Sequence, residues 1–210
     1  MEVSNLKSAS ILKKSVVMPL FDYNKEEIEN DQFNNSKRLI FAHSFPVSIT
    51  PQNSGTWYDI DGYKVWQLDI QSKDAFSINI IFSTYFIPPG ARLFVFDKEK
   101  KFILGAFTSQ NNKPYKKLAI YPVPGDELIV QYEEPENAAF NGELEIGLVN
   151  HDYKGIFDTN NRWKRRSSQE CNVDVQCEFA SGLENERRAV CRIFTRGNEL
   201  GTCTLVNNVL

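Results

Sequence analysis

Few residues in this 210-residue chain could carry acid–base or nucleophilic chemistry. It has two histidines: His43 lies in a strand-like run, and His151 follows the last run of that kind. A serine nucleophile needs a base within hydrogen-bond reach, and the sequence has no Gly-x-Ser-x-Gly or Gly-Asp-Ser-Gly segment to supply the nucleophile. We therefore interpret both histidines as structural or solvated, and we assign no catalytic residue.

The sequence also lacks the patterns of metal and cofactor sites. Cys171 and Cys177 are separated by five residues and have no histidine near them. Structural zinc sites place paired cysteines about two to four residues apart. Neither a Gly-x-Gly-x-x-Gly segment nor a phosphate-binding loop occurs. We expect no metal ion and no cofactor.

Two pairs of adjacent acidic residues raise the question of a glycosidase. They are Asp126-Glu127 and Glu133-Glu134. Adjacent residues of a strand point to opposite faces, so neither pair can form a shared acid–base site. Because exposed Asp and Glu are the common case, we interpret both pairs as solvated strand edges.

The four cysteines, Cys171, Cys177, Cys191 and Cys203, all lie in the last 40 residues. This clustering predicts a separate, disulfide-bearing unit over residues 171–210. If a hairpin turn is centred on Gly197, Cys191 and Cys203 lie directly opposite each other, at a Cα separation that a disulfide allows.

A basic cluster, Arg162-Trp163-Lys164-Arg165-Arg166, lies in an Asn- and Ser-rich stretch that we interpret as a linker over residues 154–170. A short nucleic-acid patch and a merely solvated linker are two interpretations of the cluster. We favour a third, a protease cleavage site at Lys164, Arg165 or Arg166, because proteolytic nicking concentrates in exposed linkers.

The elements that must position these residues are short strands. Alternating apolar runs separated by turn residues predict an antiparallel β-sandwich over residues 38–153. The two-residue turn Asp61-Gly62 sets one hairpin in register, with Asp59 opposite Lys64 and with Trp57 opposite Trp66 on a core-facing side. The expected strands are 39–49, 57–60, 63–70, 76–86, 93–96, 102–107, 118–123, 128–132 and 144–149, and, in the second unit, 188–195 and 199–207.

Composition excludes several classes of protein. The chain is 41% hydrophobic and 24% charged, with a formal net charge of -3, which argues against wholesale disorder and against a nucleic-acid partner. No run of about 18 apolar residues occurs, so we expect no membrane partner. Residues 1–37 form a polar N-terminal segment in which Asp22 is a candidate helix N-cap.

Several segments, in order along the chain, resemble secreted bacterial serine proteases of the lysyl-endopeptidase type. Those that resemble the family's pro-region are Ser54–Trp57, Asp61–Ser72, Ala75–Asn79, Pro89–Phe96, and Leu104–Thr108 with Asn111-Asn112. Ser168–Cys177, Arg188–Val190 and Thr204–Asn208 resemble the start of its trypsin-like catalytic domain.

The resemblance implies a pro-domain followed by the incomplete first part of a trypsin-like β-barrel. In the family the catalytic His, Asp and Ser follow the Leu-Val-Asn-Asn strand, so none of the triad is carried over and this chain is expected to be inactive. Cys171 and Cys177 match early cysteines of the family, whose disulfide partners would lie further on. The family usually has Cys-Thr-Gly where this chain has Gly201-Thr202-Cys203, and it usually lacks Cys191.

The resemblance further implies a secreted precursor whose pro-domain assists folding and latency, with the catalytic domain of the parent protease as its partner. Residues 1–8 lack the apolar core of a signal peptide, so secretion would need a signal missing from this chain. The alternative is a free-standing secreted β-sandwich, either a binding module or a protease inhibitor derived from a pro-domain.

Overall fold

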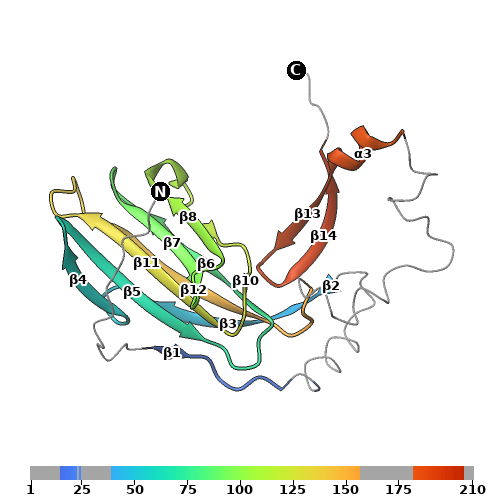
Figure 1. Ribbon diagram of the computed structural model, residues 1–210, viewed down its shortest axis with the longest axis horizontal. Helices are drawn as coiled ribbons and strands as arrows, with labels where there is room; N and C mark the ends of the chain where they lie inside the picture. Colours follow the sequence, from blue (N-terminus) through green and yellow to red (C-terminus); the bar gives the residue numbers. More distant parts are fainter. Residues whose placement is uncertain (1–14, 23, 25–38, 157–181, 206–210) are drawn as a thin grey trace.

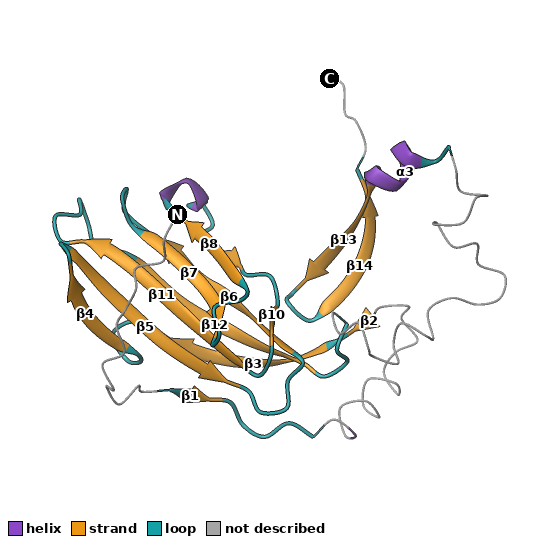
Figure 2. Ribbon diagram, in the orientation of Figure 1, coloured by secondary structure: helices purple, strands orange, loops and turns teal. Residues whose placement is uncertain are grey.

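Short strands make up most of the regular structure in the computed structural model, which is mainly β (Figures 1 and 2). The structure describes residues 15–22, 24, 39–156 and 182–205. Within these residues the strands form three open sheets, accompanied by one 3-10 turn, η1 (Ser109–Asn111), and one short helix, α3 (Glu184–Ala189).

The first sheet has the strand order β1-β5-β11-β7-β8, and β4 pairs with the same β5. All pairs are antiparallel except β1 with β5, which is parallel. The strands are β1 (Val16–Val17), β4 (Thr56–Ile60), β5 (Tyr63–Gln71), β7 (Arg92–Asp97), β8 (Ile103–Phe107) and β11 (Glu127–Pro135).

The second sheet has the order β10-β6-β12-β3, and β9 also pairs with β6. It is antiparallel throughout. Its strands are β3 (Ala42–Ile49), β6 (Ser77–Phe86), β9 (Leu118–Ala119), β10 (Val123–Pro124) and β12 (Glu143–Asp152).

One hydrophobic core joins the two sheets. The core contains alternate residues of β5, β7 and β11 from the first sheet and of β6 and β12 from the second. Strands with one apolar face exclude water from that face by packing in this way. Fully buried members include Trp66, Leu68, Ile70, Ile80, Phe82, Leu93, Val130 and Val149.

The predicted register of the Asp61-Gly62 hairpin is confirmed, with Asp59 opposite Lys64 and Trp57 opposite Trp66. Trp66 is fully buried, as predicted, but the expectation that Trp57 is a core residue is wrong, since 42% of it is exposed. The indole of Trp57 donates a hydrogen bond to the Pro51 carbonyl, and its ring makes an edge contact with the ring of Tyr132. Its strand, β4, pairs with β5 alone, so Trp57 lies at the margin of the sheet.

Several elements differ from the sequence prediction. The run predicted as one strand over 39–49 is two strands, Leu39–Ile40 and Ala42–Ile49, which belong to different sheets. The single strand predicted over 118–123 is two short strands, β9 and β10, interrupted near Pro122, which has no N–H to donate to a ladder. The strand predicted from residue 188 begins at Val190, because α3 occupies Glu184–Ala189. The short parallel strand β1 was not predicted at all.

A third sheet contains the C-terminal hairpin, with the order β13-β14-β2. It consists of β13 (Val190–Thr195), β14 (Glu199–Thr204) and β2 (Leu39–Ile40), which leads into β3 and so connects the hairpin to the second sheet (Figure 1). The Phe41 N–H donates to the Asn198 carbonyl at 2.9 Å. Phe194 packs against the rings of Phe41 and Tyr121, whereas Val190, Ile193 and Leu205 are exposed.

Candidate functional site

The two histidines lie side by side, although they are far apart in sequence. His43 on β3 and His151 on β12 are directly opposite partners in the antiparallel ladder. His43 is half-buried, and only 3% of His151 is exposed. His151 therefore belongs to β12, which continues to Asp152 rather than ending before it as the sequence suggested.

Ser72 brings a hydroxyl to His151 from the other sheet. It follows the last residue of β5, and its Oγ lies 2.8 Å from His151 Nδ1 in a buried hydrogen bond. This Ser–His contact was missed by the sequence analysis, because it depends on how the end of β5 packs over β12 and has no local sequence signal.

The Ser72–His151 pair has the right atom types for nucleophilic catalysis but not the arrangement. Only 1% of Ser72 is exposed, so a substrate carbonyl has no route to its Oγ. The adjacent carboxylate, Asp152, binds the Ser77 hydroxyl and the backbone N–H groups of Lys154 and Gly155 instead of orienting the imidazole. The pair is therefore suited to a structural hydrogen bond and not to acyl transfer.

The surroundings of His151 favour its neutral form. Burial, and to a lesser extent the neighbouring His43, lowers its pKa to about 4, while Asp74 acts in the opposite direction. Burial also raises the pKa of Asp152, partly offset by its hydrogen bonds from Ser77 and the backbone. At neutral pH the imidazole of His151 is uncharged.

An aromatic ring from the N-terminal segment covers both histidines. The Phe21 ring centroid lies 5.0 Å from that of His43, 4.8 Å from that of His151 and 5.2 Å from that of Tyr153. Phe45 adds a further edge contact with His43. The result is a small aromatic cluster at the end of β12 that shields the imidazole pair.

The prediction that Glu133 and Glu134 are solvated is wrong. They point to opposite faces of β11, as expected, yet both are buried. Glu133 accepts a hydrogen bond from Gln131 and forms an ion pair with Arg92 at 2.6 Å. Glu134 accepts hydrogen bonds from the Tyr132 hydroxyl and the Gly142 N–H, each at 2.6 Å.

In the other acidic pair, Asp126 is exposed and Glu127 forms a surface ion pair with Lys98 at 2.8 Å. One acidic pair therefore lies at the surface, whereas both carboxylates of the other pair are buried and hydrogen-bonded or ion-paired. Buried pairing explains why Glu133 and Glu134 tolerate removal from water, since a buried charge needs partners. None of these contacts forms an acid–base pair.

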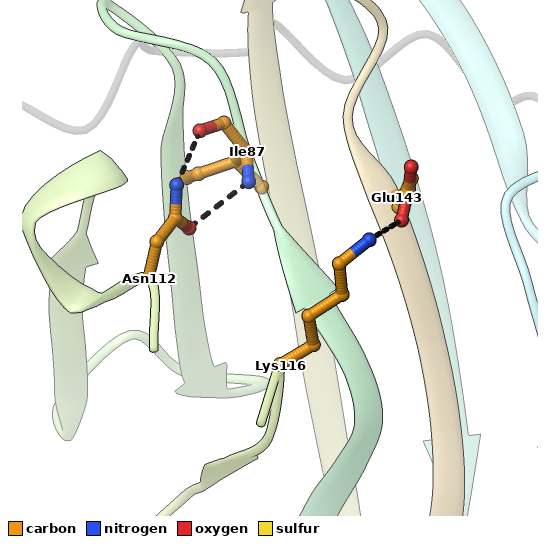
Figure 3. Close-up of polar contacts among 4 residues, drawn as sticks. All are labelled: Ile87, Asn112, Lys116 and Glu143. Atoms are coloured by element: carbon orange, nitrogen blue, oxygen red, sulfur yellow. Dashed lines mark hydrogen bonds and ion pairs between the residues drawn. The ribbon is translucent and has the colours of Figure 1, made fainter. Parts of the chain in front are cut away.

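A loop after β8 is anchored by side-chain hydrogen bonds to the backbone and exposes lysine and tyrosine side chains. Thr108 and Asn111 form a reciprocal cap on η1, and the Asn112 side chain makes two hydrogen bonds with the Ile87 backbone, at 3.1 and 2.9 Å (Figure 3). Lys116 forms an ion pair with Glu143 of β12 at 2.7 Å. The Asn111-Asn112 segment singled out by the resemblance thus has a structural role.

The cysteines and the basic cluster are only partly described. Cys191 and Cys203 are opposite partners in the β13–β14 ladder, with a Cα separation of 5.3 Å, and form a disulfide, as the predicted register allowed. Cys171, Cys177 and the cleavage-site candidates Lys164, Arg165 and Arg166 lie outside the described residues.

The described ranges contain no cluster of three or more His, Cys, Asp or Glu side chains that could hold a metal ion. Nor does any helix in that part of the chain have the length and apolar character needed to cross a membrane. No family model matches the sequence, and no solved structure matches the fold.

Proposed function

We propose that the chain is the N-terminal portion of a secreted serine endopeptidase precursor of the lysyl-endopeptidase type. In this proposal residues 38–153 are a β-sandwich pro-domain, and residues 171–210 are the first part of a trypsin-like catalytic domain. The pro-domain assists folding of the catalytic domain and keeps it latent until the linker is cut at Lys164, Arg165 or Arg166.

The observation that carries the proposal is the ordered resemblance, together with what its residues do in the fold. The Ser54 carbonyl accepts a hydrogen bond from the Trp66 indole at 2.8 Å. Gly55 has a φ of +76°, and a side chain there would collide with the same indole. Asn111 and Asn112 fix the loop after β8. These matched residues are turn and core residues of one two-sheet domain, which supports a shared fold.

The position of the C-terminal hairpin supports a templating role. Residues 188–190 and 204–208 carry the resemblance to the catalytic domain, and the hairpin between them pairs with β2 and packs through Phe194 on Phe41. A pro-domain that assists folding would hold early strands of its client in this manner. A disulfide such as Cys191–Cys203 persists in oxidising compartments, which agrees with secretion.

The experiment is refolding in trans. The full chain is added to a denatured lysyl endopeptidase catalytic domain, and recovered lysyl amidase activity is measured before and after digestion with a Lys-specific protease, whose own activity on the substrate is measured separately and subtracted. We expect a higher refolding yield and inhibition that is relieved by cleavage. A triple variant, Lys164→Gln, Arg165→Gln and Arg166→Gln, is expected to give the same yield with inhibition that persists.

Two outcomes would count against the proposal. A folded chain that alters neither yield nor activity would refute it. Inhibition of the mature enzyme without any gain in refolding yield would instead favour the alternative, a free-standing inhibitor derived from a pro-domain.

A further inference from the structure

Residues 15–22, here called the N-terminal strap, are attached to the two-sheet domain at three points. Val16 and Val17 pair with Ile70 and Gln71 at the end of β5. The Met18 N–H donates to the Gln71 carbonyl at 2.8 Å, and the Met18 side chain enters the core. Phe21 then reaches the histidine pair.

Two adjacent residues, Gln71 and Ser72, link the strap to His151. Gln71 receives the Met18 hydrogen bond, and the next residue, Ser72, makes the buried hydrogen bond to His151. The Phe21 ring centroid lies within 5.0 Å of both imidazole centroids. Opening of the strap would therefore expose the His43–His151 pair to water.

Protonation of His151 is disfavoured in the closed arrangement. A His151 imidazolium would face His43 at the opposite ladder position, and the Phe21 ring and the core side chains would keep water from solvating it. Contact of a cation with a phenyl ring would stabilise it only modestly. We propose that the N-terminal strap is an acid-released cover over the His43–His151 pair, closed while the His151 imidazole is neutral and opened when a proton binds it.

Other titratable groups near the pair are Asp74, from the turn after β5, Tyr153 and Lys154 after β12, and Asp22 beside Phe21 on the strap. Asp74 favours the charged form of His151 but is outweighed by burial and by His43. Burial raises the pKa of Asp152, so protonation of Asp152 at low pH favours the folded state, opposite to the effect of protonating His151. Its side-chain partners are Ser77 and the backbone after β12, and they do not include the strap.

The sign of the pH effect follows from the lowered pKa of His151. The closed state holds the pKa of His151 near 4, and an open state in which the imidazole regains its ordinary value of 6.5 binds more protons between these values. Above pH 6.5 the closed state of the strap is favoured to its full extent over the open state. Below that pH, the ratio of closed to open states falls by up to about tenfold for each pH unit down to about pH 4. Opening would also free the Ile70–Gln71 edge of β5 for another strand.

The test is amide hydrogen exchange on the full chain, followed by NMR. The Met18 amide reports the strap, and the Ile120 amide, which donates to the Ile80 carbonyl at 2.9 Å, reports the core. We expect the Met18 protection factor to fall at least about tenfold relative to that of Ile120 between about pH 7 and pH 4.5. His151→Gln is expected to remove most of this dependence.

Two variants of adjacent strap residues complete the design. Phe21→Ala should lower Met18 protection at every pH, whereas Leu20→Ala, at a residue that is 81% exposed, should behave like the unmodified chain. A pH-independent ratio of Met18 to Ile120 protection, or one that falls as steeply in His151→Gln, would overturn the proposal. If His151→Gln does not fold, the titration of the His151 imidazole is measured instead in the unmodified chain and in Phe21→Ala. Equal titration midpoints in these two proteins would also overturn the proposal. The proposal does not depend on the protease-precursor function.

Discussion

Tyr132 and Tyr85 offer a direct comparison of a charged and a neutral buried acceptor. Both rings are almost completely buried in the same core. The Tyr132 hydroxyl donates to the Glu134 carboxylate at 2.6 Å, whereas the Tyr85 hydroxyl donates to the Thr108 carbonyl at 3.0 Å. Burial raises the pKa of both phenols, so both hydroxyls remain protonated donors. The two Tyr→Phe variants therefore remove the same atom from comparable sites.

The expected costs differ because the acceptors differ. A hydrogen bond to a charged group contributes about 1.5–3 kcal/mol to the free energy of unfolding, and a neutral one about 0.5–1.5 kcal/mol. Tyr132→Phe also leaves Glu134 with the Gly142 N–H as its one remaining donor among the described contacts. We expect Tyr132→Phe to cost about 1 kcal/mol more than Tyr85→Phe, roughly a fivefold difference in the unfolding equilibrium constant.

The assay is urea-induced unfolding followed by tryptophan fluorescence, with free energies taken by linear extrapolation. Tyr115→Phe, at an exposed tyrosine, serves as the control and should change stability by less than about 0.5 kcal/mol. A double-mutant cycle of Tyr132→Phe with Glu134→Gln should give a coupling of about 0.5–3 kcal/mol. Equal costs for Tyr132→Phe and Tyr85→Phe, with no coupling to Glu134, would refute the reasoning.

Three further predictions concern other parts of the chain. A serine-directed fluorophosphonate should label no residue, because Ser72 is buried and no carboxylate orients His151 in the contacts of the described residues; stoichiometric labelling of Ser72, read by mass spectrometry, would contradict this. Reduction of Cys191–Cys203 should lower amide protection across β13 and β14 and leave that of β5 unchanged, because a disulfide closing a loop of this size contributes up to about 3 kcal/mol to the free energy of opening. Equal protection with and without reductant would show that the disulfide contributes nothing. Limited trypsin digestion should cut first between Arg162 and Arg166 and leave a resistant fragment near residues 38–153, and early cuts within β5 or β6 would rule out that boundary.

Local geometry could be predicted from the sequence where one turn determines the pairing. Asp61-Gly62 fixed the β4–β5 register, and a turn at Gly197 placed Cys191 opposite Cys203. Both predictions needed only the two-residue repeat of a strand and the spacing from a turn. The same logic identified the core-facing side of β5, where Leu68 and Ile70 are buried.

Predictions failed where burial depends on distant partners. Glu133 and Glu134 look like ordinary surface residues, and only the folded chain brings Arg92 to one and Gly142 to the other. Trp57 shares the face of Trp66, but its strand has no neighbour beyond β5 to cover it. The Ser72–His151 contact likewise joins the two sheets. The face on which a strand residue lies and its pairing register follow from the local sequence. Whether that residue is buried, and which side chain it contacts, depends on how the sheets pack.

The connection of β2 to β3 has a consequence for the order of folding. Leu39 and Ile40 pair with Leu200 and Glu199, residues from the opposite part of the sequence, and three residues later β3 is already in the ladder with β12. Pairs so distant in sequence close slowly, because most of the chain must be ordered before they meet. During synthesis the start of this strand therefore waits, unpaired, while the two-sheet core forms, and the arrival of β14 is the step that closes it. The docked hairpin is therefore expected to form after the two-sheet core, and its pairing with β2 would mark that core as already folded.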